Sequence, residues 1–299
     1  AHFTPPASAR RRTAWSCSNY QPISLRESVD LIIKGFEQFC RVNKTLEEAT
    51  VYGYKRIVID FLESVNKNSI TIQDITSYLD SKRELSKGRY SNILKSLRVF
   101  FRDYLKRPEM IEDFRFPSIE WKPMAAPTKE QLQLFYSKLG PLRDKVLFLF
   151  YATSGLRLSE VLQLKLSDID LSKRLIRPNI ESSRTKHRLC SFYNEEAEKL
   201  LRDYLNANDF SPDSRLFPIN ETKLTRMFQR ASKKSGVKIT AKILRQWFAS
   251  EMALLGVSDA YIDAFQGRIP RSVIARHYLN YSEERLKEIY DKADIKVLS

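Results

Sequence analysis

The sequence predicts a mainly α-helical protein of two domains, the second of which also contains a small β-hairpin. Apolar residues recur at helical spacing through most of the chain. Residues 116–127 carry prolines and lack this periodicity, so they suit a linker between two segments that are each long enough to bury a core. Two short β-type runs, residues 174–177 and 189–192, can pair as the hairpin, with residues 181–188 as their connection.

The first 115 residues are expected to form a tail and a helical domain. Residues 1–22 are rich in Pro, Ser and Arg and have little apolar periodicity, which predicts a basic disordered tail. Thr45, followed by Glu48, predicts a capping box at the start of a helix. Apolar spacing in the helical domain, residues 23–115, predicts helices over residues 25–42, 46–65, 72–82 and 87–106.

The last of these helices has a basic face opposite an aromatic and aliphatic one. A solvated face is the commoner reason for such a stripe, but acidic residues are nearly absent here, which favours contact with phosphate groups. The candidate DNA-binding residues of this stripe are Lys87, Lys95, Arg98, Arg102 and Lys106.

The second domain is expected to span residues 128–299. Thr128, with Gln131 three residues on, predicts the N-cap of its first helix. Gly155 is expected to end a buried apolar helix and Arg157 to begin the next, where an arginine beside free N–H groups suits a phosphate. Glu160 is expected to orient or pair with a nearby cation rather than to act on a substrate.

Further cations lie in the second half of this domain. Lys242 and Arg245 are three residues apart and share a face of a helix expected over residues 240–255. Arg268 and Tyr278 follow. Fixed cations and a phenol can neutralise and attack a phosphodiester. Other helices are expected over residues 194–206, 222–234 and 283–293, the last packing either on its own domain or on a neighbouring protomer.

Composition points to a polyanionic partner. The net charge is +15 with a pI near 9.6, and a division near residue 124 leaves +6 before it and +9 after it, so both halves favour DNA. Three cysteines and three histidines show neither a disulfide framework nor metal-ligand spacing, and no metal ion or other cofactor is expected. The longest obvious apolar run, residues 146–152, is far shorter than the roughly 18 residues of a membrane helix. We therefore expect an intracellular, cytoplasmic protein that acts on DNA and not on a membrane.

Two segments resemble the catalytic motifs of the tyrosine recombinases, the phage-integrase family. Residues 151–170 contain Thr-Ser-Gly-Leu-Arg-Leu-Ser-Glu-Val-Leu, which is similar to the family's first motif nearly residue for residue. In the second segment, Lys242 and Gln246 stand where the family has two histidines, and Arg268 stands where it has the histidine of Gly-His. Lys-x-x-Arg and Gln-Gly-Arg at these places resemble the integrases of archaeal viruses and plasmids.

The resemblance implies a fold, a reaction and a set of site residues. The fold would be a helical core-binding domain plus a mixed α/β catalytic domain. The activity would be site-specific cleavage and rejoining of double-stranded DNA at attachment sites through a 3′-phosphotyrosyl intermediate, without metal or ATP, to integrate or excise a mobile element. The protein would act as a homo-tetramer on DNA and be a monomer or dimer when free. The implied catalytic residues are Arg157, Lys186, Lys242, Arg245, Arg268 and Tyr278.

Several assignments stay open. Lys186 fits the hairpin lysine that protonates the departing 5′-hydroxyl, with Arg184 as the second choice. Tyr278 requires a one-residue insertion relative to the family's usual spacing, and Tyr281 is its alternative. Two alternative functions stay open. The replaced histidines are compatible with a DNA-binding protein that has lost catalysis, and the same chemistry is used by type IB topoisomerases to relax DNA.

Overall fold

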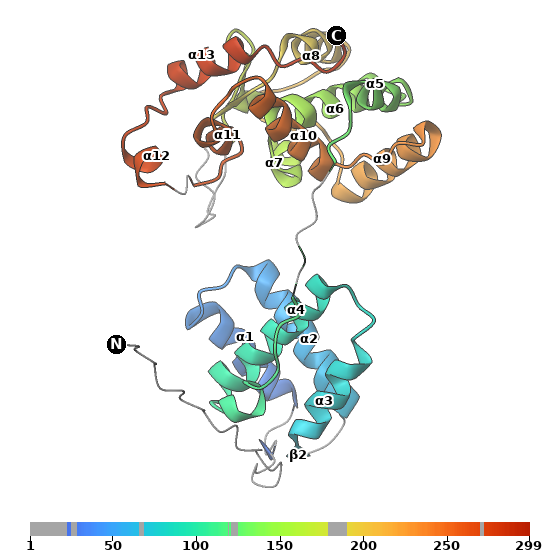
Figure 1. The fold of residues 1–299 in the computed structure, drawn as a ribbon. Helices are drawn as coiled ribbons and strands as arrows, with labels where there is room; N and C mark the ends of the chain where they lie inside the picture. The colour runs from blue at the N-terminus through green and yellow to red at the C-terminus, as the bar shows by residue number, and fades with distance from the viewer. Residues whose placement is uncertain are drawn as a thin grey trace, which may run out of the picture. The chain divides into compact units, whose positions relative to one another are not determined.

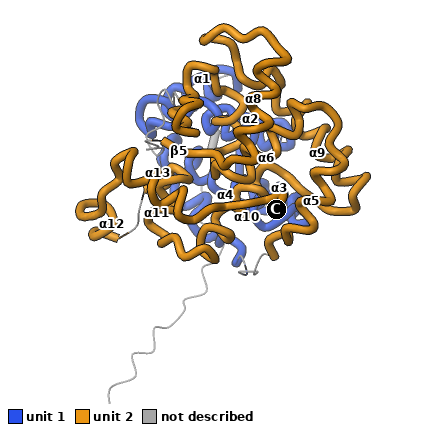
Figure 2. Tube along the Cα trace, turned by 90° about the horizontal axis from the view of Figure 1, so that it is seen from above, with its two compact units in different colours: residues 1–122 blue, residues 123–299 orange. Residues whose placement is uncertain are grey.

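The computed structural model describes residues 23–24, 29–65, 69–118, 120, 125–178, 190–269 and 272–299. The chain forms two compact units, residues 1–122 and 123–299 (Figure 2). The expected tail, residues 1–22, lies outside the described residues. No helix among the described residues combines the length and the apolar character that a membrane-spanning segment needs.

Unit 1 is a helical bundle with a minimal two-stranded sheet, in which Ile23 of β1 lies opposite Ile70 of β2. Its elements are β1 (Ile23–Ser24), α1 (Val29–Val42), α2 (Glu48–Val65), β2 (Ser69–Ile70), α3 (Ile72–Ser81), α4 (Lys87–Arg98), the π-helix η2 (Val99–Tyr104) and the 3₁₀-helix η3 (Pro108–Met110).

Aromatic side chains form the centre of the unit 1 core. Phe36 of α1, Phe61 of α2, and Phe100 and Phe101 of η2 are fully buried. The rings of Phe36 and Phe100 meet edge to face with centroids 5.3 Å apart, and those of Phe61 and Phe101 with centroids 5.6 Å apart. Such pairs contribute about 0.5–1.5 kcal/mol beyond the burial of their area. The π-helix therefore locks α1 and α2 together.

Two local predictions for unit 1 are wrong. The helix expected to reach Lys106 is α-helical only to Arg98 and continues as η2. A π-helix bonds residues five apart, so Arg102 leaves the face that α-helical spacing assigned to it, and Lys106 lies past the helix with φ of +57°. Thr45 does not cap α2, because its φ is +50° and its hydroxyl donates to the Lys44 carbonyl at 2.8 Å.

Unit 2 is mainly helical with one small antiparallel sheet in the order β3-β4-β5, which confirms the predicted fold class. Its elements are α5 (Lys129–Ser137), α6 (Leu142–Ser154), α7 (Leu158–Gln163), the 3₁₀-helix η4 (Leu166–Asp168), β3 (Ile169–Asp170), β4 (Leu175–Ile176), β5 (Ser191–Phe192), α8 (Glu195–Asn206), α9 (Glu221–Ser235), α10 (Ala241–Leu254), α11 (Asp259–Phe265), α12 (Val273–His277) and α13 (Glu283–Ala293).

Helix α6 is the centre of unit 2. Residues 146–154 are all buried, which explains a run that is apolar on every side. Helices α8 and α10 pack against it (Figure 1). The predicted capping box at Thr128 is confirmed at the start of α5, where the Gln131 N–H donates to the Thr128 hydroxyl and the Gln131 side chain accepts from the Thr128 N–H.

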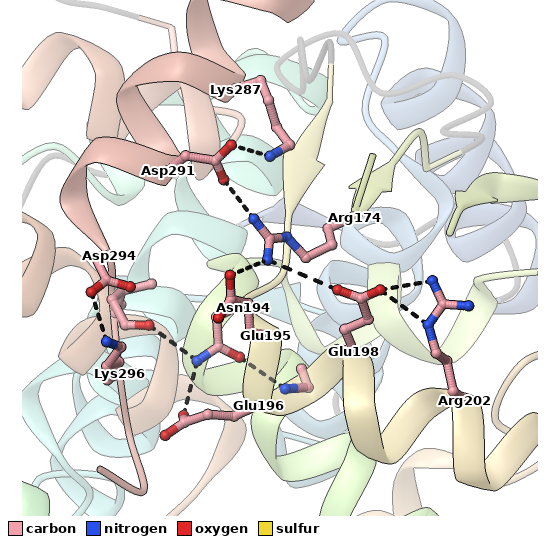
Figure 3. Close-up of polar contacts among 12 residues, drawn as sticks. Arg174, Asn194, Glu195, Glu196, Glu198, Arg202, Lys287, Asp291, Asp294 and Lys296 are labelled. Atoms are coloured by element: carbon pink, nitrogen blue, oxygen red, sulfur yellow. Dashed lines mark hydrogen bonds and ion pairs between the residues drawn. The ribbon is translucent and has the colours of Figure 1, made fainter. Parts of the chain in front are cut away.

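The C-terminal segment packs on its own unit rather than leaving it. The Tyr290 hydroxyl donates to the Thr153 carbonyl at 2.8 Å. The Asn194 amide donates to the Ile295 carbonyl at 3.0 Å, and Arg174 pairs with Glu195 at 2.9 Å and with Asp291 at 3.1 Å (Figure 3). Helix α13 is thus tied to α6, to α8 and to the turn between β3 and β4.

Candidate active site

A glycine turn between α6 and α7 positions Arg157. Gly155 ends α6 with φ of +62°, and a Cβ atom there would lie 2.6 Å from the Phe248 ring, so both conformation and space require glycine. The chain then places Arg157 at the N-cap of α7. The Arg157 backbone N–H donates to Glu160 Oε2 at 2.6 Å and its Nη1 donates to Oε1 at 2.7 Å. Glu160 is buried and orients the arginine, as predicted.

Arg245 comes from α10 and meets Arg157 at a short stretch after α11. Arg245 Nη2 donates to the Gln266 carbonyl at 2.6 Å, and its Nη1 donates to the Gly155 carbonyl. Arg157 Nη2 donates to the carbonyl of the next residue, Gly267, at 3.1 Å. Two arginines 88 positions apart in the sequence are therefore fixed by carbonyls of adjacent residues.

Gln266 completes this arrangement, although sequence reasoning assigned it no role. Its side chain is fully buried, and its Nε2 returns a hydrogen bond to the Arg245 carbonyl at 2.8 Å. Its Oε1 has no partner among the residues that the structure describes. The sequence carries no signal for this role, because a glutamine directly after a helix, as in Phe265-Gln266-Gly267, is ordinarily exposed.

The other two predicted cations of this segment lie at the surface. Lys242 is exposed on the first turn of α10, one turn before Arg245. Arg268 keeps 54% of its side chain exposed and pairs with Asp263 at 3.6 Å. An open groove of about 1020 Å³ runs beside Arg268 along α10 and α11. Neither cation contacts Arg157 or Arg245 among the described interactions. Lys242 lies on α10, and Arg268 lines a groove that α10 borders.

The two candidate tyrosines differ in accessibility. Tyr278 caps the C-terminus of α12, is 78% exposed, and its hydroxyl has no hydrogen-bond partner within the described part of the chain. The Tyr281 hydroxyl donates to the Ala275 carbonyl at 2.7 Å, its ring packs edge-on against Tyr261, and burial raises its pKa. No described contact joins Tyr278 to the arginines, so the structure does not bring the predicted nucleophile and the cations together.

The predicted hairpin residues Lys186 and Arg184 lie outside the described residues, as does most of the connection between β4 and β5. Their assignment remains a prediction. The strands that flank this connection are described, with Leu175 opposite Phe192.

The predicted basic stripe of unit 1 is only partly free for a ligand. Arg98 Nη2 donates to the Phe114 carbonyl at 2.6 Å and its guanidinium lies 4.4 Å from the Phe116 ring centroid. Arg102 pairs with Asp103 at 2.7 Å. Lys95 is exposed and has no ion pair among the described residues, and Lys87 lies 4.0 Å from Glu120.

A helical bundle followed by a mixed domain that fixes two arginines in this way defines the class of the tyrosine recombinases, which are DNA strand transferases. The chain belongs to the archaeal phage integrase family, whose model matches residues 124–294. The model of the phage integrase N-terminal SAM-like domain matches residues 32–110.

Curated relatives are recombinases of archaea and bacteria. The chain is 25% identical over 221 residues to tyrosine recombinase XerA of Saccharolobus solfataricus, covering 70% of this chain and 75% of the relative. It is 26% identical over 296 residues to tyrosine recombinase XerC of Leptospira interrogans, covering 89% and 94%. These relatives support site-specific recombination as the activity.

Solved structures share the fold at low identity. Lambda integrase bound to DNA is 14% identical and has a TM-score of 0.64 over 87% of this chain and all of that one. The Tn1549 transposon integrase in complex with circular intermediate DNA is 16% identical, with a TM-score of 0.63 over 86% of this chain and 98% of that one.

Proposed function

We propose that the protein is an integrase that inserts or excises a mobile element by cleaving and rejoining DNA at attachment sites, with Tyr278 as the nucleophile. The observation that carries this proposal is the pair of arginines fixed by Gly155, Gln266 and Gly267. Two guanidinium groups in one place suit the two non-bridging oxygens of one phosphate. Arg157 uses two of its five N–H donors on Glu160 and Gly267, which leaves donors for the phosphate.

The chemistry exchanges one phosphate ester for another. The Tyr278 phenolic oxygen forms a bond to phosphorus while the bond from phosphorus to the 5′ oxygen breaks. The departing oxygen takes a proton from Lys186, and the phenol, which is exposed to solvent, gives its own proton to water. Lys242 and Arg268 add positive charge around the transition state. The 3′-phosphotyrosyl bond conserves the ester, so the reverse attack rejoins the strand.

Tyr278 is preferred over Tyr281 for a physical reason. The Tyr281 hydroxyl is already a donor to a backbone carbonyl, and its raised pKa disfavours the phenolate that attacks phosphorus. Because no described contact joins Tyr278 to the arginines, DNA binding has to bring the two together.

Unit 1 would clamp the duplex as a core-binding domain, with residues 116–127 as the linker and residues 128–299 as the catalytic domain. Reciprocal exchange between two duplexes needs four active sites, so we propose a homo-tetramer on DNA. Mass photometry of the protein with attachment-site DNA should then show complexes of four protomers on two duplexes.

The reaction is tested with an end-labelled duplex from the element's attachment region, incubated with protein in EDTA and separated on a denaturing SDS gel. We expect a slow-migrating adduct that Tyr278→Phe abolishes and Tyr281→Phe retains. Loss of the adduct in Tyr281→Phe alone would reverse the assignment of the nucleophile. If DNA is bound but neither this duplex nor a nicked suicide substrate forms an adduct, the protein is a silent DNA-binding relative and the proposal fails.

A further inference from the structure

The turn that ends α11 is a Schellman motif. The Gly267 N–H donates to the Ala264 carbonyl at 2.9 Å, and the Arg268 N–H donates to the Asp263 carbonyl at 2.8 Å. Gly267 lies between these bonds with φ of +60°, in the left-handed region. Two such hydrogen bonds around a left-handed glycine commonly close a helix. We call residues 263–268 the α11 turn.

The α11 turn is the place where three predicted cations of the site meet the same stretch of main chain. Its Gln266 carbonyl accepts from Arg245, and its Gly267 carbonyl accepts from Arg157. Arg268 is the residue that directly follows Gly267. The main chain of Arg268 is therefore beside the carbonyls that hold the two arginines, and the direction of its side chain decides whether its charge adds to theirs.

Asp263 lies where it can control that direction. In a Schellman motif, an apolar contact frequently accompanies the longer hydrogen bond and joins the side chains at its two ends. Here those two side chains are an ion pair, with Asp263 Oδ1 at 3.6 Å from Arg268 Nη1. The Asp263 side chain is 24% exposed and that of Arg268 is 54% exposed. The carboxylate thus holds one side of the guanidinium, and the rest stays open to solvent.

A second carboxylate of α11, Asp259, makes a natural comparison. Asp259, Asp263 and Arg268 all line the groove of about 1020 Å³ beside α10 and α11. Asp259 is exposed in the first turn of α11 and has no ion pair within the described part of the chain. Both carboxylates repel a phosphate from a distance, but of the two only Asp263 is paired with Arg268.

We propose that Asp263 is a positioning residue for the cleavage reaction, which holds the Arg268 guanidinium at the α11 turn so that Arg157, Arg245 and Arg268 meet one phosphate. This rests on the proposed function and deepens it by assigning a role to Asp263. The ion pair partly neutralises Arg268 and so weakens its attraction for DNA, whereas the fixed direction stabilises the transition state. Loss of the carboxylate therefore has opposite effects on binding and on cleavage.

The test compares Asp263→Asn with Asp259→Asn as the matched control. Each variant removes one negative charge from the same groove, and asparagine is nearly the size of aspartate and keeps the backbone bonds of the turn. We expect Asp263→Asn to lower the rate constant of covalent-adduct formation about tenfold and to leave the dissociation constant for DNA within about threefold, or to tighten binding. Asp259→Asn should leave both quantities within about threefold.

A double-mutant cycle shows whether Asp263 acts through Arg268. On a nicked suicide substrate, which accumulates slow product, Asp263→Asn should change the rate by less than about twofold once Arg268→Ala is present. A full loss in that background would show a merely structural role and overturn the proposal. Equal rates for Asp263→Asn and Asp259→Asn would overturn it as well. Faster cleavage by Asp263→Asn would overturn it in favour of a carboxylate that restrains Arg268.

A second readout needs neither DNA nor cleavage. Phenylglyoxal modifies exposed guanidinium groups, and mass spectrometry of the peptides measures the rate at Arg268. We expect this rate to be about two- to fivefold higher in Asp263→Asn than in the unaltered protein or in Asp259→Asn, because an exposed ion pair contributes little more than this. An unchanged rate would show that the pair does not hold Arg268 in solution. An absent covalent adduct in the unaltered protein would instead contradict the proposed function and leave this result standing.

Discussion

Two backbone carbonyls hold the guanidinium of Arg245 at the site. The carbonyls of Gly155 and Gln266 are neutral acceptors, so they orient the guanidinium without cancelling its charge. A carboxylate in their place would satisfy the arginine and weaken its pull on a phosphate. Gln266 contributes twice, because its carbonyl accepts from Arg245 and its amide donates to the Arg245 carbonyl.

Replacing Gln266 should therefore slow cleavage without weakening DNA binding. We expect Gln266→Leu to lower the rate constant of covalent-adduct formation about ten- to a hundredfold, equivalent to about 1.4–2.7 kcal/mol, because the arginine loses its fixed geometry. The dissociation constant for DNA should change by less than about threefold, since the charge remains. Single-turnover cleavage and fluorescence titration measure the two quantities.

Gln246→Leu is the matched control, because it removes a glutamine next to Arg245 that makes no described hydrogen bond. It should leave the cleavage rate within about threefold of the unaltered protein. A Gln266→Leu protein that cleaves normally, or that loses DNA binding and cleavage in equal measure, would contradict the positioning role.

The sequence predicted Arg157 and Arg245 as cations of the site, and Glu160 as a residue that orients or pairs with a nearby cation, because side chains of characteristic type recur at characteristic spacing. It could not identify Gln266 as a positioning residue. The hydrogen bonds involved are made to backbone carbonyls, which every residue carries, and the partners lie 21 and 90 positions apart. The packing of α6 and of α11 against α10 brings these carbonyls to the arginine.

Polar contacts help to attach the C-terminal segment to its own unit, and they can be tested one by one. Asn194 caps α8 through the Ala197 N–H and also donates to the buried Ile295 carbonyl. Asn194→Ala should lower the free energy of unfolding by about 2–4 kcal/mol, because it removes a cap and leaves a buried carbonyl without its donor. Asn220→Ala, which removes only the cap of α9, should cost about 1 kcal/mol. Equal losses in urea denaturation would contradict the proposed anchoring by Asn194.

The contribution of Asp60, which links α2 to α3, to the stability of the protein should decrease in acid. Hydrogen bonds from the Tyr78 hydroxyl at 2.7 Å and from Lys82 at 2.9 Å hold the pKa of Asp60 below its usual 3.8. A carboxyl group with a lowered pKa contributes stability above its unfolded value and loses that contribution as pH falls through its folded value. The difference in melting temperature between the unaltered protein and Asp60→Asn should thus be largest near neutral pH and vanish in acid. A difference that grows on acidification would contradict this assignment.

The start of a helix can be predicted closely from the sequence where an N-cap side chain marks it. Thr128 and Thr240 both accept from the third backbone N–H of their helices, and the cap at Thr128 was predicted from the sequence. The end of α4 was not predictable. The π-helix η2 lies where four aromatic rings pack across three helices, and this tertiary packing leaves no pattern in the local sequence. Thr45 shows that a capping pattern can also mislead. The sequence has the pattern of a capping box, but Thr45 adopts a positive φ and does not cap α2.

Net charge of +15 gives the whole molecule a strong electrostatic attraction to DNA. If six or more phosphates are neutralised across both units, affinity for a duplex should fall by at least about a thousandfold between about 50 and 200 mM salt. Fluorescence anisotropy titrations at several salt concentrations measure this slope. A decrease smaller than about tenfold would show that few of the cations contact phosphate.

The sequence favours Tyr278 as the attacking residue but leaves Tyr281 as its alternative, because Tyr278 itself requires a one-residue insertion relative to the family's usual spacing. The structure separates them by exposure and by the hydrogen bond that occupies Tyr281. The most direct test is to trap the covalent complex, digest it with trypsin and fragment the peptide that carries the nucleotide. Cleavage after Arg276 leaves both tyrosines on one peptide, so the fragment ions decide between them. We predict the nucleotide on Tyr278, and its presence on Tyr281 or on any other residue would contradict the proposed active site.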